Sequence, residues 1–221
     1  MEVSLLKHKK QELKETFSTN LSLRVHRALS WLERSEQCST EDVDSQFIFL
    51  WIAFNSAYAC NGETHKRTEA ESYTQFIAKL VDLDQSQSVY KILWQTFPSS
   101  IRLLMNNQYV FQPFWDFHNG KIEEIEWQNK FSRAKKAANA ALGNQDTVAL
   151  ASNVLSRLYT LRNQLMHGGA TYNSSANRAQ LKDAVNIMKQ LVPVIINVMM
   201  DNPNTLWGDA HYPYLGKQQN K

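Results

Sequence analysis

The chain has 221 residues, of which 43% are hydrophobic and 20% charged; that is enough apolar material for a core and excludes a disordered tail. Its 7 glycines and 5 prolines are roughly half the usual share, which argues against a sandwich or barrel and favours long helices. The formal net charge of +3 permits a nucleic-acid partner without requiring one.

The cysteines and the apolar stretches predict a soluble, cytoplasmic protein without a membrane segment. Cys38 and Cys60 lack the pattern of a disulfide framework or a zinc site, so we interpret them as reduced core thiols. The N-terminal residues are charged throughout and contain no apolar signal region. The longest apolar stretches fall well short of the ~18–20 residues of a membrane span.

The first third of the chain predicts three helices. A polar amphipathic helix over 2–17 is followed by a helix that reaches Gln37, with Asn20 or Ser22 as its cap. A connector at 38–44 precedes a strongly apolar helix from Val43 to Cys60. Apolar residues recur there at spacings of three and four, on so wide a face that this helix should be central and mostly buried. They include Phe47, Leu50, Trp51, Phe54 and Tyr58.

The middle of the chain has a weaker pattern. Asn61 and Gly62 should end the apolar helix, and helices are expected at 69–82 and 86–96, with Pro98 closing the second. The aromatic-rich stretch 105–120 should be irregular or short-helical, and its rings are expected in the core rather than as a base-stacking platform. A helix over 123–142 should then end at Gly143.

Two regular helices are predicted after this segment. The first spans 146–167 and ends at Gly168 and Gly169; the second spans 176–200 and has a heptad-like apolar seam. Pro193 lies inside the second helix and should kink it. Residues 202–221 form a polar and aromatic tail.

One motif suggests chemistry: Arg162, Asn163 and His167, in the last turns of the helix over 146–167. An arginine offers a planar fork for a phosphate, and a histidine can move protons near neutral pH. Together, without metal ligands, they suffice to cleave RNA by attack of the 2′-hydroxyl on the adjacent phosphate. Arg162 and His167 lie about 140° apart around a helix axis. Two helices packed across a twofold axis would bring two such pairs into one cleft.

At these residues the chain resembles the HEPN family, whose hallmark is an arginine followed five residues later by a histidine, commonly with Asn, Asp or His directly after the arginine. The resemblance implies an all-α, up-and-down helical bundle as a single domain. Its core would span about 19–60 and 144–200, with a helical insertion over about 61–143. It implies a metal-independent endoribonuclease that acts on single-stranded RNA as a homodimer, without a cofactor, in a toxin–antitoxin or phage-defence setting with an antitoxin or operon-encoded partner.

Some members of the family carry a modified tyrosine two residues after the histidine. Here that position is Gly169, and the nearest tyrosine is Tyr172. Control by that modification is therefore not expected for this chain.

Other residues are secondary candidates. Asn55 should form a hydrogen bond between buried helices, with a supporting role toward the motif as the alternative. Arg24 and Arg27 on one helix, and Lys135 and Lys136 on another, are candidates to line an RNA path beside Trp31 and Trp127. The alternative for these cations is a solvated helix face.

The motif has alternatives as well. Arg162 and His167 would be structural if the arginine paired with a carboxylate and the histidine capped the helix end. Asn163 would orient either Arg162 or the substrate, or it would be a polar residue at a dimer seam. Because the net charge is mild, the chain as a whole would alternatively be a non-catalytic module that binds nucleotides or proteins, or a helical partner in a larger complex.

Overall fold

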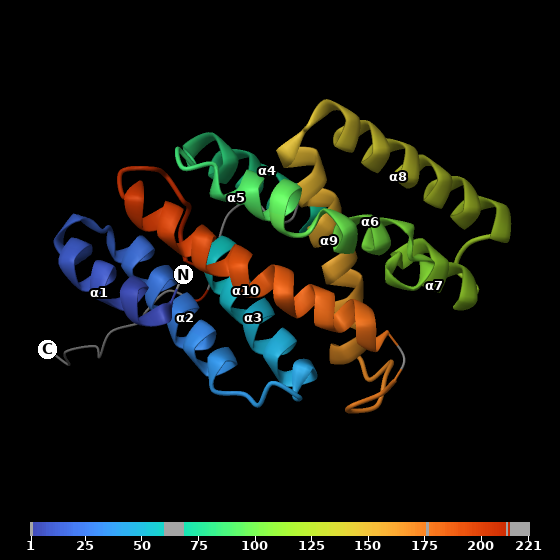
Figure 1. The fold of residues 1–221 in the computed structure, drawn as a ribbon, viewed down its shortest axis with the longest axis horizontal. Helices are drawn as coiled ribbons and strands as arrows, with labels where there is room; N and C mark the ends of the chain where they lie inside the picture. Colours follow the sequence, from blue (N-terminus) through green and yellow to red (C-terminus); the bar gives the residue numbers. More distant parts are fainter. Residues whose placement is uncertain (1, 60–68, 176, 211, 213–221) are drawn as a thin grey trace, which may run out of the picture.

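The structure is a computed structural model that describes residues 2–59, 69–175, 177–210 and 212, without the side chains of residues 69, 70 and 72. All regular elements among these residues are helical, as predicted (Figure 1). In chain order they are α1 (Val3–Leu13), η1 (Lys14–Thr16), α2 (Thr19–Glu36), α3 (Val43–Tyr58), α4 (Glu69–Leu83), α5 (Ser88–Lys91), the π-helical turn η3 (Ile92–Thr96), α6 (Pro98–Asn106), η4 (Gln108–Val110), α7 (Gln112–His118), α8 (Glu124–Asn144), α9 (Thr147–Met166) and α10 (Arg178–Asp201).

The centre of the molecule is built by α2, α3 and α10, which pack against one another. Figure 1 shows α10 crossing α2 and α3, with α1 at one end of the molecule and α7 and α8 at the other. Phe47, Leu50 and Phe54 of α3 are fully buried, so the prediction of a central α3 is confirmed. On α10, the seam residues Val185 and Met188 are likewise buried. Burying these side chains removes their apolar surface from water, which stabilises the bundle.

Helix α10 is long and apolar enough to cross a membrane by length and composition alone. Its most apolar 18-residue window is, however, 67% buried inside the fold, where α10 packs against α2, α3 and α1. Burial against other helices explains its apolar character, because a helix surrounded by protein has no polar face to present. Pro193 lies inside this helix, and the kink that it predicts stays a prediction.

Helix α4 joins the same core, although it belongs to the predicted insertion. Its Ile77 and Leu80 are fully buried, and the helix packs against α9 and α10. Helix α8 behaves differently, because only Ala138 and Ala141 of its 21 residues are buried. Helices α4 and α8, both in the segment between residues 69 and 144, therefore differ in how deeply they are buried.

The helix ends agree with the sequence in part. Asp42 and Asp146 cap α3 and α9 as the pattern indicates, with side chains that accept hydrogen bonds from Ser45 N at 3.1 Å and Ala149 N at 2.9 Å. The cap of α2 is Ser18 rather than Asn20 or Ser22, because the helix begins at Thr19, two residues before Leu21, the first residue of its apolar pattern. The expected break at Asn61 and Gly62 lies outside the described residues.

The helical segment of α5 and η3 ends at Thr96, directly before Pro98, as predicted for the helix over 86–96. Pro98 also starts α6, where the absence of a proline N–H costs nothing. One further expectation about a break was wrong. Gly143 lies inside α8, and Gln145 provides the left-handed cap with a φ of 53°. The aromatic stretch 105–120 is short-helical, as predicted, and forms η4 and α7.

The described part of the C-terminal tail folds back onto the bundle. Trp207 is 7% exposed and lies with its ring centroid 5.9 Å from that of Phe76 on α4. Asn20 on α2 donates a hydrogen bond to Asp209 at 2.6 Å. Residues 202–210 are therefore part of the packed structure.

Cys38 was expected in the core, but it is partly exposed at the end of α2. Its Sγ lies 3.8 Å from Nη1 of Arg34. The connector between α2 and α3 starts at this point, so the helix packing that would bury the thiol ends there. Cys60 lies outside the described residues.

Candidate functional site

The candidate motif occupies the C-terminal end of α9. The helix ends in a Schellman motif: Gly168 has a φ of +70°, and Gly169 N donates to Gln164 O at 2.7 Å. A side chain on Gly169 would meet that carbonyl oxygen at 3.1 Å. The two glycines therefore end the helix as predicted, and they leave His167 at the cap position with an exposed side chain.

Arg162 is held one turn earlier, at the edge between solvent and core. Its Nη1 donates to Asn163 Oδ1 at 2.9 Å, and its guanidinium carbon lies 5.9 Å from the ring centroid of Tyr159. Its Nε is buried and has no hydrogen-bond partner. Among the described residues, no carboxylate forms an ion pair with Arg162. The motif arginine is thus oriented by its neighbours but not neutralised by an acid.

This geometry bears on the roles of Asn163 and His167. Asn163 accepts a hydrogen bond from Arg162, which is the orienting arrangement. His167 caps the helix through its backbone N–H, which donates to Asn163 O at 3.0 Å, rather than through its ring. No hydrogen bond joins the side chains of Arg162 and His167, two residues that the structure describes fully.

Helix α3 lies beside Arg162 through an aromatic contact. The ring centroid of Trp51 is 6.1 Å from that of Tyr159, the residue over which Arg162 lies. Asn55, one turn further along α3, has a buried Oδ1 without a hydrogen-bond partner. The hydrogen bond predicted for Asn55 therefore does not involve this oxygen. Trp51 Nε1 is likewise buried and unpaired.

The loop that follows the motif is fastened to α3 and α9. Arg178 pairs with the buried Asp44 at 2.6 Å, and its Nε donates to Ser174 O at 3.0 Å. Asn177 donates to Gln164 at 3.1 Å. These residues line a small hollow of about 20 Å³ beside the C-terminal end of α9. Because Asp44 neutralises Arg178, this arrangement fixes the loop rather than offering a second free cation.

Tyr172 lies in this loop and is exposed. The nearby Asp42 carboxylate raises the pKa of the Tyr172 phenol, since a negative neighbour disfavours the phenolate. Asp42 is also the cap of α3, so the exposed part of the loop and the start of α3 are electrostatically linked.

The structure separates the other predicted residues from the motif. Arg24 is 1% exposed, and its guanidinium donates to the carbonyls of Ala57, Trp207 and Gly208. The expectation that Arg24 lines a surface path is wrong, because the folded-back C-terminal segment covers it. This role could not be found from local sequence, since Trp207 and Gly208 lie more than 180 residues further along the chain. Arg27 is partly exposed and donates to Tyr212 O at 2.7 Å.

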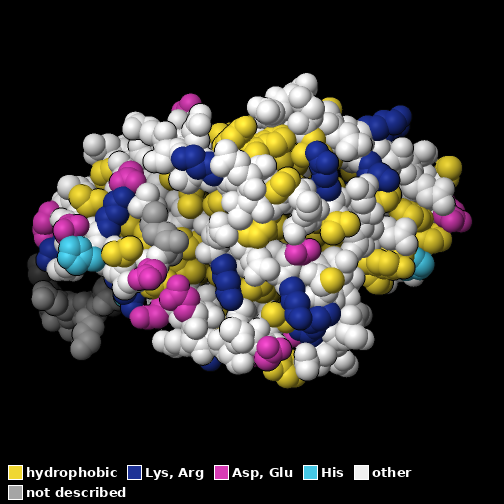
Figure 2. All heavy atoms as spheres, in the orientation of Figure 1, with side chains coloured by type: hydrophobic (Ala, Val, Ile, Leu, Met, Phe, Trp, Pro, Cys, Tyr) yellow, Lys and Arg dark blue, Asp and Glu magenta, His cyan; other side chains and the backbone are white. Residues whose placement is uncertain are grey.

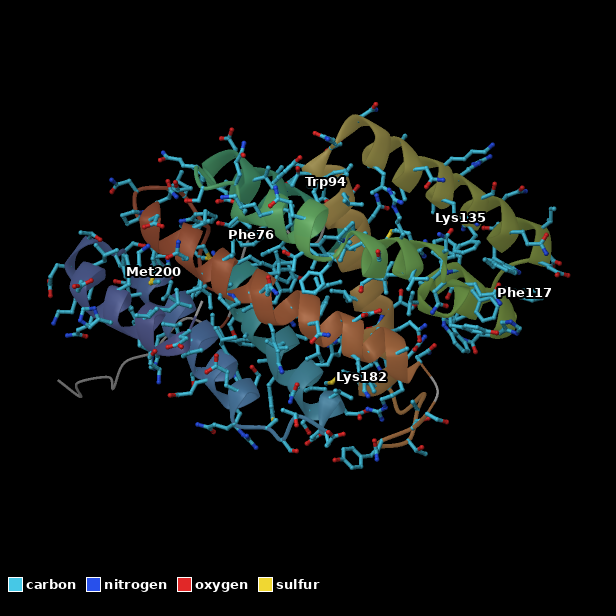
Figure 3. The ribbon with its side chains drawn as sticks, viewed as in Figure 1. Phe76, Trp94, Phe117, Lys135, Lys182 and Met200 are labelled. Atoms are coloured by element: carbon cyan, nitrogen blue, oxygen red, sulfur yellow. The ribbon has the colours of Figure 1, made fainter. Side chains whose placement is uncertain are left out.

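Lys135 and Lys136 lie on α8, away from the end of α9. Figure 3 places Lys135 at the end of the molecule formed by α7 and α8, which also carries Phe117, whereas Lys182 lies near the start of α10. Lys135 Nζ is 5.6 Å from the ring centroid of Phe131, and Lys136 is exposed. Figure 2 shows basic side chains spread over the visible face and acidic ones most numerous over α1 and α2. That face carries no dense basic patch.

Sequence reasoning missed one buried cation, Arg157. It is 4% exposed, lies between the rings of Phe111 and Phe131 at 4.3 and 5.6 Å, and donates to Met105 O at 3.4 Å. Burial lowers its pKa to about 10. Arg157 lies inside the apolar stripe of α9, and this position in the sequence pattern could have indicated that it is buried. The described residues contain no group of three or more His, Cys, Asp or Glu side chains that could hold a metal ion.

No family model, no curated protein and no solved structure matches this chain. What the fold and the site define is an all-α protein with an arginine–asparagine pair and an exposed histidine at the end of one core helix.

Proposed function

We propose that this protein is a metal-independent endoribonuclease of the HEPN type that cleaves single-stranded RNA. Arg162 would stabilise the charge that develops on the phosphate, and His167 would move the protons of the 2′-hydroxyl and the leaving 5′-oxygen. Asn163 would keep the Arg162 guanidinium in position. The products would be a 2′,3′-cyclic phosphate and a 5′-hydroxyl. A toxin or phage-defence role, with an antitoxin or operon-encoded partner in the cytoplasm, belongs to the same proposal.

The observation that carries the proposal is the state of Arg162. Its guanidinium is oriented by Asn163 and Tyr159 and has no acidic partner among the described residues. An arginine whose only role is structural at a helix end would pair with a carboxylate or with the terminal carbonyls. A guanidinium held in place without an anion is suited to bind one from outside, and a phosphate fits its planar fork.

A homodimer is part of the proposal because one chain does not bring the two side chains together. Arg162 and His167 lie five residues apart, about 140° around the helix axis. In a twofold dimer, the arginine of one protomer would face the histidine of its partner across the cleft. Both residues lie at the surface-facing end of α9, which is compatible with such an arrangement.

The test is cleavage of an end-labelled single-stranded RNA in EDTA. The wild type should cleave, and His167→Ala and Arg162→Ala should each lower the rate by roughly 100-fold or more. Matched controls are His8→Ala and Arg102→Ala, which remove an exposed histidine and an exposed arginine from α1 and α6. Loss of cleavage on adding EDTA, or equal cleavage by wild type and His167→Ala, would contradict the proposal.

Mixing the two inactive variants tests the composite site. A heterodimer of Arg162→Ala and His167→Ala retains one intact arginine and one intact histidine, on opposite protomers. Recovery of part of the activity on mixing is the expected result. If active protein remains monomeric by analytical ultracentrifugation, the composite site is wrong even if the ribonuclease assignment stands.

The second candidate is a non-catalytic module that binds nucleotides or proteins. The mild net charge of +3 and the scattered basic side chains in Figure 2 favour it. A large increase in the melting temperature with one nucleotide, together with no RNA cleavage, would support this candidate.

A further inference from the structure

A stacked group of side chains lies where α2 meets α3, away from the motif. The rings of Trp31 and Phe49 are stacked, with centroids 5.7 Å apart and an interplanar angle of 24°. The guanidinium carbon of Arg34 lies 4.9 Å from the Phe49 centroid. Trp31 is 37% exposed, and Arg34 is exposed and forms no ion pair with any described residue. We call Trp31, Arg34 and Phe49 the stacked triad.

The charges on α2 are segregated around this triad. Arg27, Trp31 and Arg34 are spaced four and three residues apart, so they share one face of the helix. Glu33 lies on a different face, where it forms an ion pair with Lys7 of α1. Glu36 follows Glu33 by three residues and therefore lies on the same face of α2. The triad therefore lies on the basic side of α2, and the acidic groups of this helix face α1.

Helix α3 connects the triad to the motif. Phe49 faces α2, whereas Trp51, two residues later, contacts Tyr159 beneath Arg162. Adjacent helix axes lie about 8–10 Å apart, so α2 and α9 are separated across α3 by roughly 16–20 Å. About six stacked nucleotides at 3.4 Å each span that distance.

We propose that the stacked triad is a base-stacking site for single-stranded RNA, at which the strand is held while its phosphate reaches Arg162. The exposed face of Trp31 would take one base, and Arg34 would pair with the adjoining phosphate. The choice of RNA as the ligand rests on the proposed function. The triad itself has two features suited to binding single strands: an aromatic ring that is partly open to solvent, and a cation that forms no ion pair with any described residue.

The experiment measures binding of a fluorescent 12-nucleotide single-stranded RNA to the His167→Ala protein in EDTA, by anisotropy. Trp31→Ala should weaken binding by roughly 5- to 150-fold, the range for loss of one stacked base, whereas Trp31→Phe should retain most of the affinity. Arg34→Ala should weaken binding and reduce the slope of log K against log salt by about 0.7, as expected for one lost phosphate contact on a single strand.

Ile125→Ala and Arg102→Ala are the matched controls. They remove a 64% exposed apolar side chain from α8 and an exposed cation from α6, and should leave affinity and salt slope unchanged. Circular dichroism and melting curves verify that each variant is folded. Equal affinity of Trp31→Ala and the parent protein, or an equal loss in the controls, would overturn the proposal.

The outcome for the triad is separable from the outcome for the proposed function. If the wild type binds RNA through Trp31 and Arg34 but does not cleave it, the triad stands and the ribonuclease assignment fails. If the wild type cleaves RNA and the Trp31→Ala variant binds and cleaves normally, the assignment stands and the triad fails. If the folded protein binds no RNA, the triad is not an RNA site. A protein would then be the expected partner of that surface.

Discussion

The bundle of α2, α3 and α10 and the lobe of α7 and α8 are held together in different ways. In the bundle, aliphatic and aromatic side chains such as Leu50, Phe54 and Met188 are completely buried. In the lobe, α8 buries two alanines, and its larger contacts are rings arranged edge to face, such as the partly exposed Trp127 against the buried Phe114 at 5.2 Å. Arg157 of α9 inserts between two more rings there.

This difference shows that one chain can combine a rigid frame with an element attached by few contacts. The bundle gains its stability from the burial of apolar area, which is lost only when the whole bundle opens. The lobe relies on ring stacking and on one desolvated cation, each of which contributes less. We therefore expect α8 to exchange its amide protons before α3 does.

Phe54→Ala should have the largest effect on stability. Phe54 is fully buried and packs against Trp51 and Tyr58 with ring centroids 5.4 and 4.8 Å away. Its truncation leaves a cavity in the bundle, so the free energy of unfolding should fall by about 3–5 kcal/mol. Urea denaturation monitored by circular dichroism measures the change. The matched variant is Phe117→Ala in the lobe, for which a loss as large as that of Phe54→Ala would contradict the comparison.

Arg157→Ala should loosen the lobe specifically. The variant loses the stacking of the guanidinium on Phe111 and Phe131 and its hydrogen bond to Met105. We expect a loss of about 2 kcal/mol, the value of a desolvated cation–π contact. Hydrogen exchange should show faster exchange in α8 and unchanged rates in α3. Arg157→Lys keeps the charge without the planar ring contact, so its stability should lie between those of the wild type and Arg157→Ala. Equally faster amide exchange in α3 and α8 would contradict a local role.

Gly168→Ala should destabilise the end of α9 by about 1 kcal/mol, because a φ of +70° is unfavourable for any residue with a Cβ. Gly143→Ala is the matched control of opposite sign. That glycine is helical, with open space around it, so alanine should stabilise α8 by roughly 0.5–1 kcal/mol. Thermal melts of the two variants should therefore shift in opposite directions. A shift of both in the same direction would contradict the helix ends described above.

Glu36→Gln should have the smallest effect, and one that depends on pH. Burial, followed by the carboxylates of Glu2 and Glu33, raises the pKa of Glu36 above 4.5 in the folded protein. The folded state then binds a proton more tightly than the unfolded chain, so stability falls as the pH rises through the region just above 4.5. The variant should lack this fall and be a few tenths of a kcal/mol more stable at pH 7. Melting temperatures between pH 4 and 7 provide the measurement. A variant less stable than the wild type at pH 7 would contradict the predicted effect of Glu36.

The sequence by itself determined the features that depend on neighbouring residues. The spacing of Phe47, Leu50 and Phe54 predicts the buried face of α3, and the start of the apolar pattern predicts where α3 and α9 begin. Gly168 and Gly169 predict the end of α9 and hence where His167 lies. These features follow from helical periodicity and from the hydrogen bonds of helix ends, which involve residues only a few positions apart.

Only the tertiary structure decided what distant segments do to each other. Arg24 has the sequence pattern of a surface cation, yet carbonyls 33 and 183 residues away bury it. Arg157 is hidden in the same way between Phe111, which directly precedes α7, and Phe131 of α8. That Arg162 has no acidic partner among the described residues also became visible only with the helices in place. Such contacts depend on how whole helices pack, and no local pattern encodes which carbonyl or ring will lie beside a given guanidinium.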